Sequence, residues 1–269
     1  MIGIKLQGQL GNQMFQYAFA YSLAKHFKTD FFIDTSLRKI FDVPKYFDLP
    51  EYNFWKNLFR WISSILFRKM KLLEVDPCTK PSFYQNKLKD NILYKGYFHS
   101  EEYFKNIQRE LQNIFVVKEK HKKQFVLKYG KLYKDNKIIA VHIRRTDFLN
   151  WGGRSIALPV EYYKKCLAKI NNIANCKILF ASDDMDFCIK NFSHLKNAIF
   201  NADSVIIDFL KIQNADYCII ANSSLSWWAA YLNNKQGHKI YAPQYWLGFK
   251  EKQEVPVGVL VKNWELVEV

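Results

Sequence analysis

A six-residue segment near the middle of the chain, His142-Ile143-Arg144-Arg145-Thr146-Asp147, carries a high density of groups that could do chemistry. Arginine presents a rigid fork of N–H donors with a permanent charge, which matches the oxygens of a phosphate. Neighbouring residues of a strand point to opposite faces, so only one of Arg144 and Arg145 is expected to face a ligand. The other is expected to pair with a carboxylate and stiffen the loop. Asp147 is available for that pairing or for proton transfer, and a plain surface ion-pair cluster is the alternative interpretation.

Two adjacent carboxylates, Asp183 and Asp184, follow the apolar run 177–181. Such carboxylates can accept hydrogen bonds from guanine N–H groups or ribose hydroxyls, and either of them can instead cap the next helix. Asp184-Met185-Asp186 also has the spacing with which some transferases hold a metal on a diphosphate. We expect no metal site here, because Asp186 should already lie inside the helix.

Two further segments combine small or amide side chains with the start of a helix. Asn222, Ser223 and Ser224 precede a helical run, and helix N-termini with small hydroxyl residues are ready anion sites. Trp227 and Trp228, which follow, are expected in the core. Gly8 to Gln13 is glycine-rich and also precedes a helix, for which Asn12 is the expected cap. It matches a dinucleotide fingerprint only superficially, because the third glycine is missing.

These segments follow short apolar or β-branched runs, which suit strands of a parallel sheet. We expect strands at 2–6, 30–34, 92–98, 137–143, 177–181, 198–200, 217–221 and 239–242. We expect helices from Asn12 through Phe27 and at 53–71, 101–115, 159–170, 184–192, 204–213 and 223–232, with another in the lysine-rich stretch after Val117. This alternation predicts an α/β protein with parallel sheets flanked by helices.

The βα pattern occurs in two series, which meet near Asp135-Asn136. We therefore predict two Rossmann-like βα domains, 1–135 and 136–269, facing a cleft, with a C-terminal tail able to pack back on the first. Open α/β sheets bind ligands at the carboxyl ends of their strands. The loops after Leu6, Ile143, Ala181 and Ala221 are then the places to look for a site.

Composition limits the class of protein. The 269 residues are 49% hydrophobic, which is enough for one large or two smaller cores, and no segment reads as a signal peptide or a membrane span. Five cysteines without a C-x-x-C pair suit a reducing compartment, so a cytoplasmic protein is expected. The net charge of +15 favours anionic partners. Nucleic acid is a distant alternative, because the arginines share a strand-end loop with carboxylates instead of forming a basic stripe among exposed aromatics.

The segment 55–72 alternates Lys and Arg with Trp, Phe, Ile and Leu. That pattern is typical of helices that lie on anionic membranes, and it equally suits a helix packed on the N-terminal core with basic flanks. Both interpretations stay open from the sequence, and peripheral contact with the cytoplasmic membrane face is the hypothesis to test.

Four segments together resemble the α-1,2-fucosyltransferase family, which adds fucose from GDP-fucose to a terminal galactose. They are LGNQMFQYAFAYSLA (10–24), HIRRTDF (142–148), FASDDMDF (180–187) and NSSLSWWAAYLN (222–233). The chain departs from the family where Gln9 stands in place of a second glycine, and the region 38–90 matches nothing recognisable. The resemblance implies a GT-B-like, inverting fucosyltransferase that takes GDP-fucose and a galactose-terminated glycan. No metal is expected, because Arg144 would carry the charge of the diphosphate, and a lipid-linked acceptor would fit the membrane hypothesis for 55–72. A fucosyltransferase of another linkage, or a transferase of another nucleotide sugar, is the alternative.

The resemblance also implies roles for single residues. The C-terminal domain would hold the nucleotide, and the N-terminal domain would lie on the acceptor side. Arg144 would grip the β-phosphate, with His142 beside the diphosphate or ribose, and Asp183 would read guanine or ribose. Asn12 would reach towards the reacting centre. The full set expected at the donor is Gly11, Asn12, Gln13, His142, Arg144, Arg145, Asp183, Asp184, Asn222, Ser223 and Ser224, and the catalytic candidates are Arg144, Asp147 and Asn12.

Overall fold

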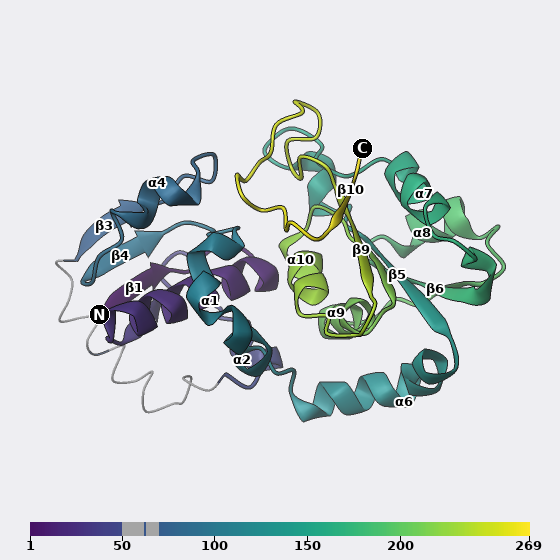
Figure 1. Ribbon diagram of the computed structural model, residues 1–269, viewed down its shortest axis with the longest axis horizontal. Helices are drawn as coiled ribbons and strands as arrows, with labels where there is room; N and C mark the ends of the chain where they lie inside the picture. Colours follow the sequence, from purple (N-terminus) through teal and green to yellow (C-terminus); the bar gives the residue numbers. More distant parts are fainter. Residues whose placement is uncertain (50–61, 63–69) are drawn as a thin grey trace. The chain divides into compact units, whose positions relative to one another are not determined.

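The computed structural model describes residues 1–49, 62 and 70–269, and the chain divides into two compact units. The first unit comprises residues 1–118 and 255–261, and the second comprises 119–254 and 262–269. Each unit is built around one sheet of parallel strands (Figure 1). The predicted mixed α/β class with parallel sheets is therefore confirmed. The basic segment at 55–72 lies almost wholly outside the described residues.

The sheet of the first unit has its first strand in the middle. In spatial order its strands are β2 (Phe31–Asp34), β1 (Ile2–Lys5), β4 (Ile92–Lys95) and β3 (Lys71–Glu74). The middle position of β1 depends on Gly3, where a Cβ atom would lie 2.7 Å from the Phe32 ring and 2.8 Å from Leu93. Because the chain leaves β1 towards β2 on one side and pairs with β4 on the other, the loops after β1 and β4 meet at a topological switch point.

Helix α1 (Leu10–Phe27) is buried on almost every side, because it lies between this sheet and the segment η1 (Glu101–Glu110). Phe19 stacks on Phe98 with ring centroids 3.9 Å apart, and Phe15 packs against Phe104. Within the described part of the unit, the other short helices include α2 (Val43–Tyr46), α4 (Pro81–Gln85) and α5 (Leu111–Ile114).

The prediction that Asn12 caps α1 is wrong. The helix begins at Leu10, its N-cap is Gln9, and Asn12 lies inside the first turn. The cause is Gly8, whose φ of +69° turns the chain towards the helix earlier than the sequence pattern indicated.

The second unit contains a longer parallel sheet. In spatial order its strands are β10 (Glu265–Val267), β9 (Lys239–Pro243), β8 (Tyr217–Ile219), β5 (Lys137–Ile143), β6 (Cys176–Ser182) and β7 (Ala198–Phe200). Residues 138–143 of β5 are all buried, as expected for a central strand covered on both faces. Its neighbours are β6 and β8, so the loops after these three strands meet at the switch point of this sheet.

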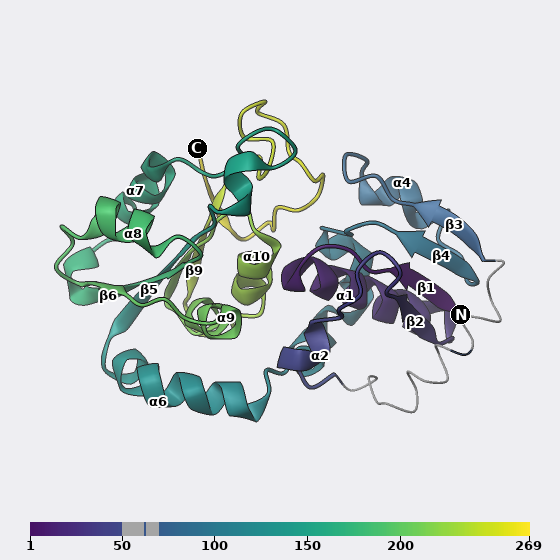
Figure 2. The same cartoon turned by 180° about the vertical axis from the view of Figure 1, so that it is seen from behind.

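Helices cover both faces of the second sheet (Figures 1 and 2). One face carries α7 (Val160–Ala168) and α8 (Met185–Phe192), and the other carries α6 (Glu119–Asp135), α9 (Val205–Gln213) and α10 (Ser224–Tyr231). Two short 3-10 segments complete the unit, η2 (Asp147–Asn150) and η3 (Ile173–Asn175).

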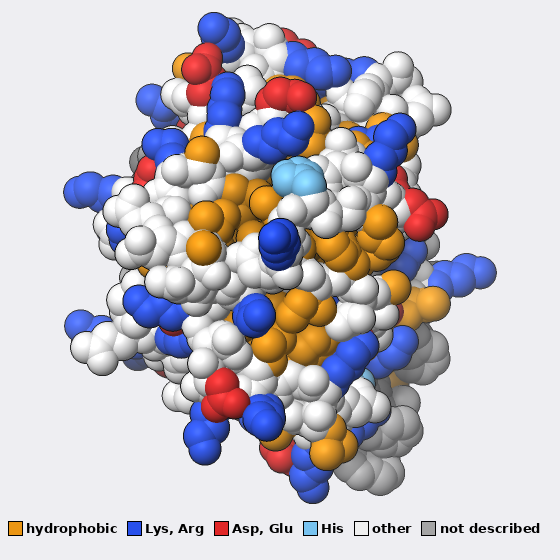
Figure 3. Space-filling view, turned by 90° about the vertical axis from the view of Figure 1, so that its right-hand side faces the viewer, with side chains coloured by type: hydrophobic (Ala, Val, Ile, Leu, Met, Phe, Trp, Pro, Cys, Tyr) orange, Lys and Arg blue, Asp and Glu red, His pale blue; other side chains and the backbone are white. Residues whose placement is uncertain are grey.

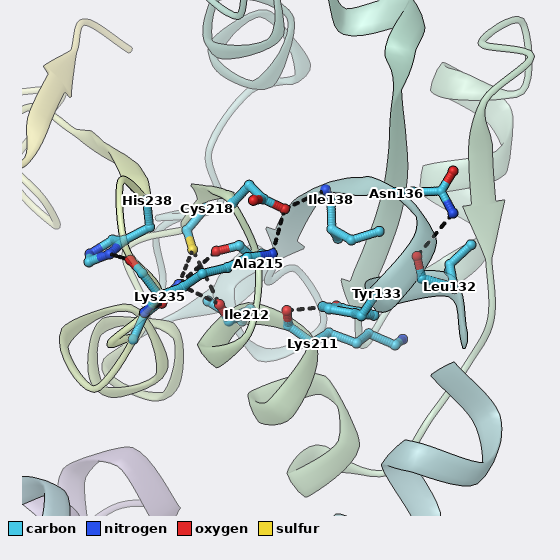
Figure 4. A network of polar contacts seen from close by, with 12 residues as sticks. Leu132, Tyr133, Asn136, Ile138, Lys211, Ile212, Ala215, Cys218, Lys235 and His238 are labelled. Carbon is cyan, nitrogen blue, oxygen red and sulfur yellow. Dashed lines mark hydrogen bonds and ion pairs between the residues drawn. The ribbon is translucent and has the colours of Figure 1, made fainter. Parts of the chain in front are cut away.

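Polar contacts explain why α6 belongs to the second unit. Tyr133 of α6 donates to the carbonyl of Lys211 in α9 at 2.8 Å (Figure 4). Lys128 of α6 pairs with Asp203 at 2.7 Å, and Asp203 also pairs with the buried Lys211 ammonium at 2.9 Å. The division between the units therefore falls at residues 118–119, whereas the sequence pattern suggested 135–136.

The C-terminal tail is shared between the units. Residues 255–261 belong to the first, where the Val257 amide donates to the carbonyl of Pro77 at 2.9 Å. Residues 262–269 belong to the second and supply β10, a strand that the sequence pattern did not predict.

Two questions raised by the sequence concern the surface and the membrane: whether basic side chains form a stripe that could bind nucleic acid, and whether any helix could span a membrane. On the face shown in Figure 3, Lys and Arg side chains are scattered singly and do not gather into one stripe. Among the residues that the structure describes, no helix is long and apolar enough to cross a membrane.

Candidate functional site

The second unit brings three of the predicted segments to one edge of its sheet. Residues 144–147 follow β5, 183–184 follow β6, and 222–224 follow β8. These strands are neighbours in the sheet, so the loops converge at its carboxyl edge. The polar side chains on them can be followed contact by contact.

Arg144 is held by two carboxylates from two different loops. Its Nε lies 2.8 Å from Oδ1 of Asp147 and 3.3 Å from Oδ2 of Asp183, and its side chain is 22% exposed. Asp147 was expected to pair with the arginine that is turned away from the ligand or to transfer a proton, and in the structure it pairs with Arg144. The guanidinium is thus fixed in place while still reaching the surface, as a group that binds an anion must be.

Arg145 has a bracing position. Its Nε lies 3.0 Å from Oδ2 of Asp184, and its guanidinium lies over the Phe187 ring, 3.8 Å from the centroid. Asp184 also caps α8, which was the alternative to donor contact for either carboxylate: its Oδ1 accepts from the Phe187 amide at 3.0 Å. One carboxylate therefore ties the loop after β5 to the start of α8.

Asp183 is used by the backbone of the same loop. Its carboxylate accepts from the amides of Arg145 at 2.9 Å and Thr146 at 3.2 Å, and from the Thr146 hydroxyl. Its expected contact with guanine or ribose stays a prediction. In the structure, Asp183 fixes the shape of the loop that carries Arg144.

Two buried atoms of this site, Nδ1 of His142 and Oδ1 of Asn222, have no hydrogen-bond partner among the residues that the structure describes. Burial lowers the pKa of His142 to about 3, with a smaller contribution from the nearby Arg144, so the ring is neutral. Asn222 uses its Nδ2 to donate to the carbonyl of Ile156 at 2.9 Å. Buried polar atoms are rarely left unpaired, so these two are candidates to bind water or ligand.

The start of α10 supplies backbone donors. Ser223 is the N-cap with extended backbone and no capping bond from its side chain, Ser224 opens the helix, and the first turn has no acidic residue. Such a helix start favours an anion. Trp227 and Trp228 are fully buried, as predicted.

The D-x-D spacing at 184–186 does not form a ligand pair, because Asp184 is the cap of α8 and Asp186 lies within its first turn. Among the described residues, no group of three His, Cys, Asp or Glu side chains could hold a metal ion.

The first unit places a second, uncharged set of polar groups at the switch point of its own sheet. Gln13 is fully buried; its amide nitrogen donates to the carbonyls of Gly8 at 3.2 Å and Ile40 at 3.1 Å, and its Oε1 accepts from the Asp42 amide. Gln13 thus holds the loop after β1 in place, and the buried Gly11 lies in the first turn of α1.

Asn12, the remaining predicted residue, contacts a histidine that the sequence analysis missed. Its Oδ1 lies 2.9 Å from Nε2 of His99, in the loop after β4. Burial lowers the pKa of His99 to about 3, so the ring is neutral, and Nε2 donates because Oδ1 can only accept. On the other side, a Cβ atom on Gly8 would lie 2.2 Å from Nδ2 of Asn12, so only glycine leaves room for this amide. The sequence feature that could have identified His99 is its position directly after the predicted strand 92–98.

Comparison with solved structures shows which fold the chain has. The structure is similar to the α-1,6-fucosyltransferase NodZ soaked with GDP-fucose, with a TM-score of 0.54 over 86% of this chain and 92% of that one, at 14% identity. It is also similar to the apo form of POFUT1, with a TM-score of 0.52 over 90% and 97% of the two chains, at 10% identity. The fold is that of the GT-B fucosyltransferases.

The sequence comparison gives the family. The family model for Glycosyl transferase family 11 matches residues 1–265, and the chain belongs to this family. Its relatives include the O-antigen biosynthesis glycosyltransferase WbnK of Escherichia coli, 25% identical over 93% of this chain and 96% of that protein. Another is an α-1,2-colitosyltransferase of Escherichia coli, 27% identical over 92% of each chain. The protein is therefore a glycosyltransferase, as the motifs predicted.

Proposed function

We propose that this glycosyltransferase moves L-fucose from GDP-β-L-fucose to the 2-hydroxyl of a terminal galactose, with inversion to an α-1,2 linkage. The observation that carries the proposal is the position of Arg144. A partly exposed guanidinium, oriented by two carboxylates, lies at the switch point of a parallel sheet in a GT-B fold. That is where such sheets bind nucleotides, and a cation there matches a diphosphate.

In this proposal the second unit holds the donor. Arg144 contacts the β-phosphate, and the start of α10 at Ser223 and Ser224 donates backbone N–H groups to the phosphates. Nδ1 of His142 is left for a hydrogen bond to the diphosphate or ribose, and Oδ1 of Asn222, which can only accept, is left for a ribose hydroxyl. Asp183, which lies near His142, contacts guanine or ribose, while Arg145 and Asp184 keep the loops in place.

The reaction breaks the bond between the anomeric carbon of fucose and the diphosphate oxygen. The acceptor oxygen forms its bond to the same carbon from the opposite face, through an oxocarbenium-like transition state. Negative charge grows on the departing GDP, so a preorganised cation at the β-phosphate lowers the barrier. One donor of this kind is typically worth about 3–4 kcal/mol, and we assign this role to Arg144.

The acceptor hydroxyl must lose its proton. Asp147 is the candidate base, with a second role already visible in its 2.8 Å contact with Arg144. Asn12 is proposed at the reacting centre from the first unit, as an uncharged hydrogen-bonding group. With Arg144 supplying the positive charge on the diphosphate, catalysis is proposed to need no metal. Activity that is unchanged by EDTA supports this, and activity restored by Mg²⁺ or Mn²⁺ after EDTA contradicts it.

The test of the function is a screen of glycan acceptors with GDP-fucose, followed by linkage analysis of the product. Transfer to a terminal galactose, with a new α-linked fucose on O2, is the expected result. A product with another linkage would keep the fucosyltransferase and reject the proposed regiochemistry. Absence of any transfer or hydrolysis of GDP-fucose would reject the donor.

GDP-colitose should be tested as a second donor in the same screen, because one relative is named as an α-1,2-colitosyltransferase. Colitose differs from L-fucose by the loss of the 3-hydroxyl. GDP-fucose and GDP-colitose compared at equal concentration separate the two proposals by their kcat/KM values.

The cytoplasmic location and the contact of the basic segment 55–72 with anionic membranes form a separate proposal. A transferase acting on lipid-linked glycans would gain from such contact. Co-sedimentation of the full chain with phosphatidylglycerol vesicles at physiological salt is the test. Loss of binding when the lysines and arginines of 55–72 are changed to Gln supports the proposal, and equal recovery with neutral vesicles contradicts it.

A further inference from the structure

The loop that follows Arg144 presents an exposed tryptophan on a rigid hairpin. Trp151 and Arg154 exchange two backbone hydrogen bonds, at 2.8 and 3.2 Å, around Gly152 and Gly153. Both glycines have positive φ, +59° and +84°, which defines a tight two-residue turn that L-residues disfavour. The Trp151 side chain is 45% exposed. Its backbone is thus fixed while much of its ring surface faces solvent.

Other loops of the second unit hold the hairpin at several points. Arg154 pairs with Glu251 at 2.8 Å, and Lys250 donates to the Ser155 carbonyl at 2.7 Å, so the loop after β9 supports one side (Figure 1). Asn222 donates to the carbonyl of Ile156, so the loop after β8 supports its base. The hairpin is therefore tied to the same sheet edge as the candidate donor site.

Trp151 is also linked to Arg144 through one intervening ring. The Arg144 guanidinium lies 5.9 Å from the Phe148 centroid, and the Phe148 and Trp151 rings pack edge to face with centroids 5.8 Å apart. Phe148 itself is almost buried. Trp151 is thus separated from Arg144 by the Phe148 ring, and of these two rings it is the one with a large exposed area.

An exposed indole suits one face of a galactose ring. The axial 4-hydroxyl of galactose lies on one face and leaves the C–H groups at C3, C4 and C5 together on the other. Such an apolar face packs well on the flat ring of a tryptophan, which contributes contact area at a low cost in side-chain entropy because the hairpin is already ordered.

We propose that Trp151 is the stacking platform for the terminal galactose of the acceptor, an inference that rests on the proposed function. The donor fucose is bonded directly to the β-phosphate, so its place is at the guanidinium of Arg144. Trp151 lies one aromatic ring farther out, where the sugar that receives the fucose must approach. The second unit would then supply part of the acceptor site as well as the donor site.

The experiment compares Trp151→Ala, Trp151→Phe and the wild type with lactose as acceptor and GDP-fucose as donor. The acceptor KM is expected to rise roughly 10-fold in Trp151→Ala and to recover largely in Trp151→Phe, because a ring is restored. The dissociation constant for GDP-fucose and its hydrolysis without acceptor stay unchanged. The matched control is Leu149→Ala, since Leu149 lies in the same loop with 47% exposure but has no ring; it leaves the acceptor KM unchanged.

A binding measurement that needs no turnover separates this inference from the proposed donor. Lactose is titrated into the wild type and Trp151→Phe in the presence of GDP, with tryptophan fluorescence and calorimetry as readouts. A fluorescence change that only the wild type shows supports the platform, even if GDP-fucose is not the donor. An unchanged acceptor KM in Trp151→Ala, weakened GDP-fucose binding in that variant, or no lactose binding by the wild type each overturns the proposal.

Discussion

Both units place polar groups at the switch point of a parallel sheet, but the groups differ in charge and exposure. In each, a central parallel strand has neighbours on both sides, and polar groups gather where the loops after these strands meet. In the first unit these groups are uncharged: Gln13 and Gln16 are fully buried and bonded to main-chain atoms, and Asn12 pairs with a neutral His99. In the second unit they are charged and partly exposed, with Arg144 and Arg145 facing carboxylates.

The difference indicates how each site could meet a ligand. A guanidinium that is held by carboxylates but still partly exposed can take a diphosphate as a further partner without losing its position. Buried amides are costly to unpair, so they fix a pattern of donors and acceptors that does not change with pH. We therefore expect charge changes to act most strongly in the second unit and changes of a single neutral hydrogen bond to act weakly in the first.

The largest effect is expected at Arg144. In Arg144→Ala, kcat with GDP-fucose should fall by about 10²–10³-fold, because a preorganised donor to the leaving group is lost. Steady-state kinetics with saturating acceptor measures the change. Arg109→Ala is the control, since Arg109 is an exposed arginine at the end of η1 in the other unit. Near-normal turnover in Arg144→Ala would remove the basis of the proposed mechanism.

Asp147→Asn tests whether Asp147 acts as a base or as a support for Arg144. Its 2.8 Å contact with Nε of Arg144 favours the support, so donor affinity and kcat should weaken together. A charge-assisted hydrogen bond is worth about 1.5–3 kcal/mol, which corresponds to a combined loss of roughly 10–100-fold. Donor binding by calorimetry and kcat by initial rates are measured side by side. A loss confined to kcat, with donor affinity intact, would make Asp147 the base.

Acid should destabilise the second unit through His142. Burial holds the pKa of this histidine at about 3, below its ordinary value of 6.5. Above pH 6.5 both folded and unfolded chains carry a neutral ring, and the full stability is present. As the pH falls from 6.5 towards 3, the unfolded chain takes up a proton that the folded chain does not, so the free energy of unfolding decreases.

The loss from this one group is about 2 kcal/mol at pH 5. Urea unfolding of the wild type and His142→Asn at about pH 7.5 and pH 5 measures it, as a smaller pH-dependent loss in the variant. Asp208, whose pKa burial raises to about 6, acts in the opposite direction, but it is present in both proteins and cancels. Equal losses in the two proteins would show that His142 takes up its proton in the folded state.

The sequence predicted the regular elements well where burial is complete. The β-branched run 137–143, which is buried from residue 138 to residue 143, has the predicted bounds in the structure. The strands β3 and β10 were not predicted, because each has only two adjacent apolar residues in a segment of three or four that is mostly exposed. The sequence motifs predicted the family. They did not predict which carboxylate pairs with Arg144 and which with Arg145.

The contacts that the sequence did not predict depend on the conformation of loops and on the order of strands in the sheet. His99 meets Asn12, 87 positions away, only because β4 pairs with β1, and the order of strands in a sheet is not written in their patterns. The place of Asn12 inside α1 followed from the backbone of Gly8, and the pairing of Asp147 with Arg144 followed from the turn after β5. In the last two cases the conformation of a single loop decided the geometry.

The smallest expected effect tests the neutral pair of the first unit. In His99→Leu the donor to Oδ1 of Asn12 is lost, and one neutral hydrogen bond is worth about 0.5–1.5 kcal/mol, so kcat/KM should fall roughly 2–10-fold. His99→Gln keeps an N–H donor and should recover most of the rate. The exposed His26 provides the control variant His26→Leu, which should behave as wild type.

A double-mutant cycle decides whether His99 works through Asn12. If it only orients that amide, His99→Leu should cost nothing further once Asn12 is already Ala, so the two changes are not additive. Additive losses would mean that His99 acts independently of Asn12, and thermal unfolding of all four proteins separates either result from a loss of stability. A neutral pair that shows coupling, beside a charged site that dominates the rate, would establish that the first unit positions while the second unit stabilises charge.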